Sequence, residues 1–123
     1  MGYDKTVLVV DEPAALSEFV AWALREELGV RTLVAPGADE AVRTAAMAAP
    51  DLVLLVLVKP LADGIAVARW LKADPARRSI PVVALSAWPP SPGPDPDAAL
   101  CDEVIAAPCA LDALVGRVRA RLS

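Results

Sequence analysis

The sequence predicts an α/β fold in which a parallel β-sheet is covered by helices on both faces. Short apolar segments of strand length alternate along the chain with segments of helical spacing, and this alternation is typical of parallel sheets. Residues 52–58, LVLLVLV, are a run of seven apolar residues, whose length and valine content favour a strand buried on both faces. With 123 residues, 56% hydrophobic and 23% charged, the chain can bury one core, so residues 1–123 are predicted to form a single domain.

The expected elements follow from local signals along the chain. Strands are predicted at residues 6–10, 31–35, 52–58, 81–86 and 103–106, and helices at residues 14–28, 39–49, 65–72 and 112–122. Pro13 suits the first turn of the first helix, Gly29 suits its end, and Pro50 stops the second helix. Helical spacing predicts that the first helix buries one apolar face, made of Leu16, Phe19, Val20, Ala23 and Leu24.

The alternation is interrupted once, between the fourth and fifth strands. The segment WPPSPGPDPD holds five prolines between Pro89 and Pro96. A proline inside a helix costs about 3 kcal/mol, so the helix expected at this point is predicted to be disrupted. A short helical turn around residues 97–100 is all that this segment can add.

Composition excludes several classes of function. The net charge is −4 and no basic cluster is present, which argues against direct binding to nucleic acid. The apolar runs are far shorter than the roughly 20 residues of a membrane span, so we expect a cytoplasmic protein without a membrane partner. The chain has no histidine, and two cysteines alone do not form a zinc site. Cys101 and Cys109 could pair if the fold brought them together, but we favour two small reduced hydrophobic residues.

Four segments together resemble the receiver domain of bacterial two-component response regulators. They are VLVVDEP (7–13), PDLVLLVLVKPLADG (50–64), LKADPARRSIPVVALSA (71–87) and LDALVGRVRARL (111–122), and the similarity extends over essentially the whole chain. The resemblance implies a flavodoxin-like (βα)5 three-layer sandwich with the strand order 2-1-3-4-5, here with the fourth helix disrupted by prolines. It also implies a place in signal transduction through a phosphorelay.

The resemblance also shows where this sequence departs from the family. In receivers an aspartate ends the third strand and accepts a phosphoryl group, two acids after the first strand hold Mg²⁺, and a hydroxyl and a lysine stabilise the developing charge. The phosphoacceptor position falls on Val56 and the lysine position on Ala107, whereas Ser86 keeps the hydroxyl. If Pro13 fixes the alignment, only Asp11 remains of the acid pair, as we favour; if the strand slips by one residue, Asp11 and Glu12 form the pair.

These departures predict a degenerate receiver, or pseudo-receiver, that is not an enzyme and holds no Mg²⁺. It would signal through contact with a protein partner, or with a second copy of itself, independently of phosphorylation. The alternative is a small-molecule sensor that uses the vacated acidic pocket, with Val56 as a partly apolar floor. Asp51 cannot replace the missing acid, because it is expected at the opposite end of the third strand.

Several other residues are candidates for function. Lys59 could reach Asp11 and supply the missing positive charge, or it could simply be solvated. Trp22 and Trp70 are predicted on helix surfaces and Trp88 heads the proline segment; exposed tryptophans are frequent at partner contacts, although single exposed apolar residues are also ordinary. Trp88, Pro89 and Pro90 begin a stretch that could present a polyproline surface or be a rigid loop. Val104 occupies the position on the fifth strand where receivers carry an aromatic switch residue.

Overall fold

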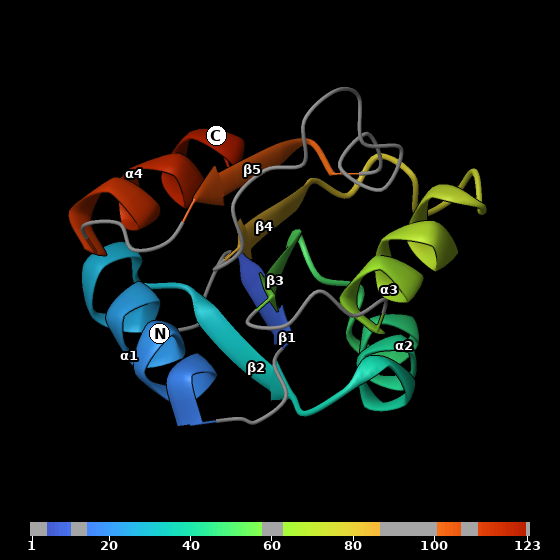
Figure 1. The fold of residues 1–123 in the computed structure, drawn as a ribbon, viewed down its shortest axis with the longest axis horizontal. Coiled ribbons are helices and arrows are strands. Elements are labelled where there is room, and N and C mark those ends of the chain that lie inside the picture. The colour runs from blue at the N-terminus through green and yellow to red at the C-terminus, as the bar shows by residue number, and fades with distance from the viewer. Residues whose placement is uncertain (1–4, 11–14, 58–62, 87–100, 107–110, 123) are drawn as a thin grey trace.

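The computed structural model of the chain describes residues 5–10, 15–57, 63–86, 101–106 and 111–122 (Figure 1). Five strands form one parallel sheet in the order β2-β1-β3-β4-β5, which confirms the predicted topology. The strands are β1 (Thr6–Val10), β2 (Arg31–Ala35), β3 (Leu52–Leu57), β4 (Val82–Ser86) and β5 (Glu103–Ala106). In this register Val56 lies opposite Leu85, and Leu57 lies opposite Ser86.

The described helices cover both faces of the sheet, as predicted (Figure 1). They are α1 (Ala15–Leu28), α2 (Ala38–Ala48), α3 (Asp63–Lys72) and α4 (Leu111–Leu122). Helix α3 begins two residues before the predicted start. Helix α2 ends one residue early because Ala49 adopts a left-handed conformation. The proline segment, where a disrupted helix was predicted, lies at residues 87–100, outside the described residues.

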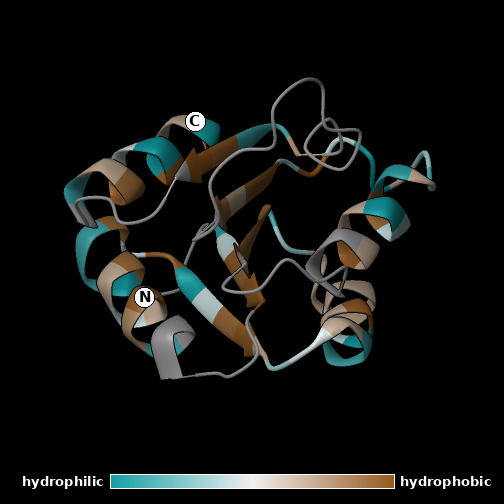
Figure 2. Cartoon of the chain, in the orientation of Figure 1, coloured by the Kyte–Doolittle hydropathy of each residue, from teal (hydrophilic) through white to brown (hydrophobic). Residues whose placement is uncertain are grey.

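Two apolar layers lie on either side of the sheet, and β3 contributes to both. Leu52, Leu54 and Val56 pack toward α1 and α4, whereas Val53 and Leu55 pack toward α2 and α3. All five side chains are buried, and Figure 2 shows the corresponding brown colour along the central strands. Burial on both faces explains why the sequence of this strand is continuously apolar instead of alternating.

Helix α1 buries a slightly different face from the one predicted. Val20, Ala23 and Leu24 are buried as expected, but Phe19 is 53% exposed, so its placement in the core was wrong. Successive helical residues are 100° apart, and the buried arc is centred between Val20, Leu24 and the fully buried Ala21. This rotation leaves Phe19 on the outer side of the helix.

Asp51 ties the amino ends of β1 and β3 together. Its carboxylate Oδ2 accepts a hydrogen bond of 2.7 Å from the Thr6 N–H, and its own N–H donates to the Thr6 carbonyl at 2.8 Å. The residue therefore lies at the end of β3 opposite to Val56, as the sequence predicted. Its role there is structural, because it satisfies the first backbone donor of β1.

Candidate functional site

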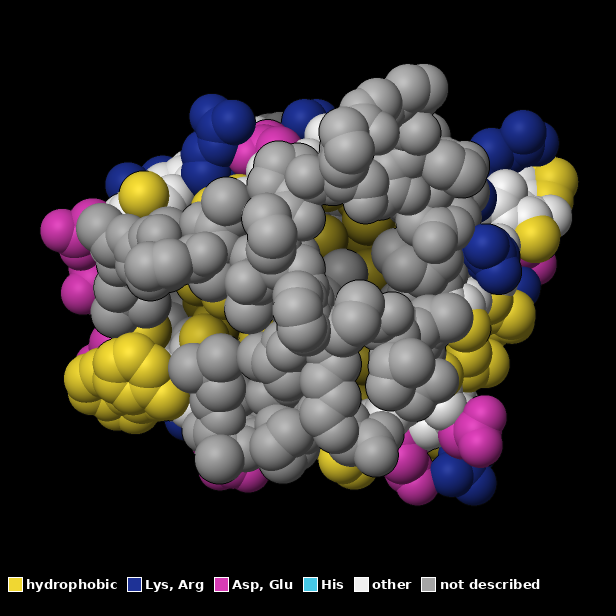
Figure 3. Space-filling view, viewed as in Figure 1, with side chains coloured by type: hydrophobic (Ala, Val, Ile, Leu, Met, Phe, Trp, Pro, Cys, Tyr) yellow, Lys and Arg dark blue, Asp and Glu magenta, His cyan; other side chains and the backbone are white. Residues whose placement is uncertain are grey.

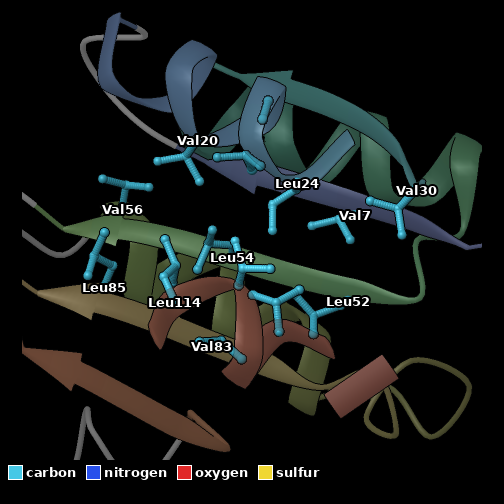
Figure 4. Close-up of a cluster of buried hydrophobic side chains, with 14 residues drawn as sticks. Val7, Val20, Leu24, Val30, Leu52, Leu54, Val56, Val83, Leu85 and Leu114 are labelled. Carbon is cyan, nitrogen blue, oxygen red and sulfur yellow. The ribbon is translucent and has the colours of Figure 1, made fainter. Parts of the chain in front are cut away.

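The carboxyl end of β3 is the place where an open α/β sheet presents its working residues. Val56, the second-last residue of β3, is only 5% exposed. Figure 4 shows its side chain in the apolar cluster shared with Val20 of α1 and Leu85 of β4. A hydrocarbon side chain in this environment has no atom that can attack phosphorus, donate a proton or bind a cation. The described part of this sheet edge is therefore apolar packing.

The structure describes only some of the other predicted site residues. Ser86 ends β4 opposite Leu57, so its backbone lies at the same edge of the sheet as Val56, but its side chain is outside the described set. Entirely outside the described residues are Asp11, Glu12, Lys59, Trp88, Pro89, Pro90, Ala107 and Cys109. The open alternatives for the acid pair, the pairing of Lys59, the polyproline surface and the small-molecule pocket stay predictions. Val104 of β5 is 48% exposed.

The described residues also bear on the other predictions from composition. Within residues 5–10, 15–57, 63–86, 101–106 and 111–122, no three side chains of the kinds that bind metals lie together. No helix in the same ranges has the length and apolar character needed to cross a membrane. Cys101 is half-buried and packs against the apolar layer under α2 and α3.

Trp22 lies on the outer face of α1, where the sequence placed it. It is 51% exposed and stacks on Phe19, with ring centroids 6.2 Å apart and an angle of 22° between the ring planes. Offset stacking of this kind stabilises the pair by roughly 1 kcal/mol beyond area burial. The pair forms an exposed apolar protrusion on a surface helix.

Trp70 is in a different environment from the one predicted. It is half-buried and packs against the layer beneath α3, and the Arg77 guanidinium carbon lies 3.7 Å from its ring centroid. Arg77 is held there by an ion pair of 3.0 Å with Asp74. The ring is thus partly covered by its own chain through a cation–π contact. Local sequence spacing could not reveal this contact, because Arg77 lies beyond the end of α3.

A network of charged groups joins α3, β4, β5 and α4, and sequence reasoning missed it. Asp102 Oδ2 accepts hydrogen bonds from the Val82 N–H at 2.7 Å and from Lys72 Nζ at 3.1 Å. Lys72 Nζ also donates to the carbonyls of Arg78 (3.1 Å) and Ile80 (3.3 Å). The sequence holds one signal for it, the acidic pair Asp102-Glu103 directly at the start of a predicted strand.

The carboxylate of Asp102 is stabilised in its ionised form by this network. Partial burial works to raise the pKa of Asp102, but the hydrogen bonds from Val82 and Lys72 and the charges of Lys72 and Arg121 outweigh it and lower the pKa below its ordinary value. Next to it, Glu103 forms ion pairs with Arg117 and, at 3.0 Å, with Arg121. Arg121 also donates to the Asp102 carbonyl at 2.9 Å. These contacts fasten the end of α4 to the edge strand.

Known proteins of similar sequence and structure agree with this fold. Over 121 residues the chain is 38% identical to the DNA-binding response regulator MtrA of Mycobacterium tuberculosis, an alignment that covers 94% of this chain and 50% of MtrA. The signal receiver domain of a signal transduction histidine kinase from Syntrophus aciditrophicus superimposes with a TM-score of 0.78 and 31% identity, covering 96% of this chain and 89% of that one. The chain belongs to the receiver-domain family of two-component response regulators.

A third relative is a response regulator solved with a bound metal complex. The response regulator TrrA of Thermotoga maritima, solved in complex with Mg²⁺ and beryllium fluoride, matches with a TM-score of 0.82 and 25% identity, covering 96% of this chain and 99% of TrrA. No family model matches the chain. The chain spans about half the length of its curated relative MtrA. The flavodoxin-like receiver fold expected from the sequence is thus confirmed.

Proposed function

We propose that this receiver domain is a pseudo-receiver, which takes part in two-component signalling by contact with a protein partner and without being phosphorylated. The observation that carries the proposal is the buried Val56 at the carboxyl end of β3. By its resemblance to the family, this position is the one that accepts the phosphoryl group in active receivers. The proposal treats residues 1–123 as one domain and includes the cytoplasmic location expected from the sequence.

The chemistry of phosphoryl transfer explains why a valine at this position is decisive. An acyl phosphate forms when a carboxylate oxygen attacks phosphorus while a cation and nearby donors neutralise the phosphate oxygens. Val56 has no oxygen to attack with and no lone pair for a metal, and it is packed against Val20 and Leu85. Ala107 further removes the positive charge that the family places before a proline. We therefore propose that the chain does not hold Mg²⁺ as active receivers do, although Asp11 keeps one acid of the pair, and that it has no enzymatic activity.

The exposed aromatic pair on α1 supports a protein as the partner. Trp22 and Phe19 are each about half exposed, and large aromatic side chains dominate many protein interfaces. MtrA is a DNA-binding regulator, but this chain has a net charge of −4 and no basic cluster. We therefore propose that it contacts protein and not nucleic acid.

Incubation with acetyl phosphate and Mg²⁺, followed by intact-protein mass spectrometry, tests the proposal. The wild-type chain is expected to keep its unmodified mass, whereas a receiver with aspartate at the end of its third strand gains a phosphoryl group in parallel. The Val56→Asp variant is treated in the same way, and it differs from the wild-type chain only by the carboxylate at this position. A phosphoryl group on the wild-type chain, mapped to any side chain at this edge, would show that the domain is an active receiver.

A further inference from the structure

The turn between α3 and β4, residues 73–80, is held in one backbone conformation by contacts within the chain. The Asp74 carbonyl accepts hydrogen bonds from the N–H groups of Arg77 at 3.0 Å and Arg78 at 2.9 Å. On the other side of the turn, Lys72 Nζ donates to the Arg78 carbonyl at 3.1 Å. A surface segment that is already ordered loses little conformational freedom when a partner binds to it, and this favours association.

Arg77 is a pre-positioned cation on this turn. Its guanidinium carbon lies 3.7 Å from the centroid of the Trp70 ring, and its Nη2 pairs with Asp74 Oδ2 at 3.0 Å. Its Nε is buried and has no hydrogen-bond partner among the described residues. A guanidinium carries five N–H donors in a planar fork that matches a carboxylate. Because stacking and an ion pair already hold this fork in place, it is prepared for bidentate recognition of an acid.

The charge of the turn is opposite in sign to that of the whole chain. Residues 73–80 contain two arginines and one acid, Asp74, which is already paired with Arg77, whereas the net charge of the chain is −4. Arg78 is exposed beside Arg77. Figure 3 shows dark blue Lys and Arg side chains at the right edge of the molecule, over the end of α3 and the turn that follows it. The turn is therefore a local positive site on an acidic protein.

We propose that this turn is a docking site for an acidic peptide segment of a protein partner. One carboxylate of the partner accepts hydrogen bonds from the Arg77 guanidinium stacked on Trp70, and a second acid pairs with Arg78. The proposal rests on the proposed function only in taking the partner to be a protein. It adds the surface that binds and the chemistry that the partner presents.

The neighbours of the two arginines favour a peptide over nucleic acid. A nucleic acid is bound through several regularly spaced phosphates, and affinity grows with the number of cations that meet them. This turn offers only two arginines, and the exposed residues beside them, Ala73, Pro75 and Ala76, are uncharged and small. Such neighbours leave room for the apolar parts of a peptide and add nothing to phosphate binding.

Titration of the full ¹⁵N-labelled chain with a short polyglutamate peptide tests the site. In buffer of low ionic strength, the amide signals of Arg77 and Arg78 and the indole N–H signal of Trp70 should shift and reach saturation. The Trp70→Phe variant identifies the indole signal, and the dissociation constant should rise with added salt. A polylysine peptide of the same length should cause no such shifts. The absence of saturable shifts at this turn, or equal shifts at exposed arginines elsewhere, would overturn the proposal.

Three variants separate recognition by this turn from general charge attraction. Arg78→Glu should raise the dissociation constant at least about tenfold, because it places an acid opposite the acids of the peptide. Arg77→Lys keeps the charge but loses the planar fork, and should raise the constant about threefold or more. Arg31→Glu changes the net charge as Arg78→Glu does, but at an exposed arginine on the outer strand β2, and should leave the constant unchanged. Equal weakening by Arg31→Glu, or wild-type binding by Arg77→Lys, would contradict the assignment.

A single-stranded DNA of the same charge as the peptide tests the class of partner. It should bind more weakly than the peptide, and tighter binding of the DNA would overturn the assignment to an acidic peptide. The docking site and the pseudo-receiver proposal can fail separately. Phosphoryl transfer to the wild-type chain would end the pseudo-receiver proposal without affecting peptide binding, whereas loss of peptide binding would leave the argument from Val56 unchanged.

Discussion

The side chain of Asp102 connects three elements of the fold. Its carboxylate accepts hydrogen bonds from the first N–H of β4 and from Lys72 at the end of α3. Asp102 itself directly precedes β5. Asn at this position keeps an acceptor for Val82 but loses the ion pair, and Ala loses both. Because the side chain is about one-third exposed, solvent screens the pair, and we expect losses of about 1 kcal/mol for Asp102→Asn and about 2 kcal/mol for Asp102→Ala. Urea unfolding of the three proteins measures these differences.

The ionisation of Asp102 makes the free energy of unfolding depend on pH, and the direction of this dependence follows from its pKa. The pKa of Asp102 is lower in the folded chain than its ordinary value of 3.8, so the folded state binds its proton less readily than the unfolded state. The stabilisation is therefore fully present above pH 3.8 and is lost as the pH falls through the folded pKa. Urea unfolding of wild type and Asp102→Asn should give a gap in stability that is constant at neutral pH and shrinks in strong acid. A gap that widens on acidification would assign the effect to another group.

Sequence reasoning was least accurate for residues whose contacts come from distant parts of the chain. Trp70 was expected at the surface, but it is half-buried because Arg77, outside its helix, lies over the ring. Phe19 was expected in the core, yet packing rotates α1 toward Ala21. Val56 was placed correctly at the end of a buried strand, because a continuous apolar run depends only on local residues. The groups that meet at Asp102 come from segments about 20 and 30 residues away, so the acidic pair Asp102-Glu103 was the one local signal of the network.

At the scale of elements, the strands were predictable almost to the residue. Strands β1, β2 and β5 have the predicted bounds, because short β-branched and apolar runs between turn residues define them locally. Helix ends were displaced by one or two residues, since end geometry depends on which residue leaves the helical conformation. The order of the strands could not come from local patterns, and the resemblance to receivers supplied it.

The ends of α1 and α2 offer a matched pair of substitutions with opposite expected signs. Gly29, after α1, has φ +64°, and its N–H donates to the Arg25 carbonyl at 3.0 Å. Ala49, after α2, has φ 47° and makes the equivalent bond to Ala45, but its Cβ strains this left-handed conformation. Gly29→Ala should destabilise the chain by about 1 kcal/mol, and Ala49→Gly should stabilise it by up to about 1 kcal/mol.

Thermal or urea unfolding of both variants measures this difference. An added Cβ at Gly29 would meet nothing within 4 Å, so a loss of stability reports backbone strain, reduced by the lower entropy of the unfolded chain. The double variant should be close to wild type, because the two sites belong to helices on opposite faces of the sheet. Stabilisation by Gly29→Ala would mean that the left-handed turn is not retained.

At the scale of the whole molecule, the apolar core extends along β3 to Val56. The apolar layers on both faces of the sheet contain the side chains of β3 from Leu52 to Val56, so a valine at the end of the strand extends the core where an aspartate would interrupt it. Burying a carboxylate there requires compensating partners, such as a metal ion and a lysine. Under the proposed function those partners are missing, so a valine at this position avoids the cost of burying an uncompensated carboxylate.

A ligand that binds the folded state raises its stability, so binding at this edge of the sheet can be measured by unfolding the intact domain. A receiver that binds Mg²⁺ and beryllium fluoride, as TrrA does in its solved complex, is stabilised by about 2.7 kcal/mol when the ligand is at 100 times its dissociation constant. For a domain of this size that corresponds to a rise in melting temperature on the order of 10 °C. If Val56 stands at the acceptor position, as we propose, this chain should show no shift beyond that caused by the salts alone, while TrrA measured beside it should shift. A rise that needs both Mg²⁺ and beryllium fluoride would show that other groups at this edge assemble a phosphoryl site, and Val56→Asp would then report whether the carboxylate strengthens it.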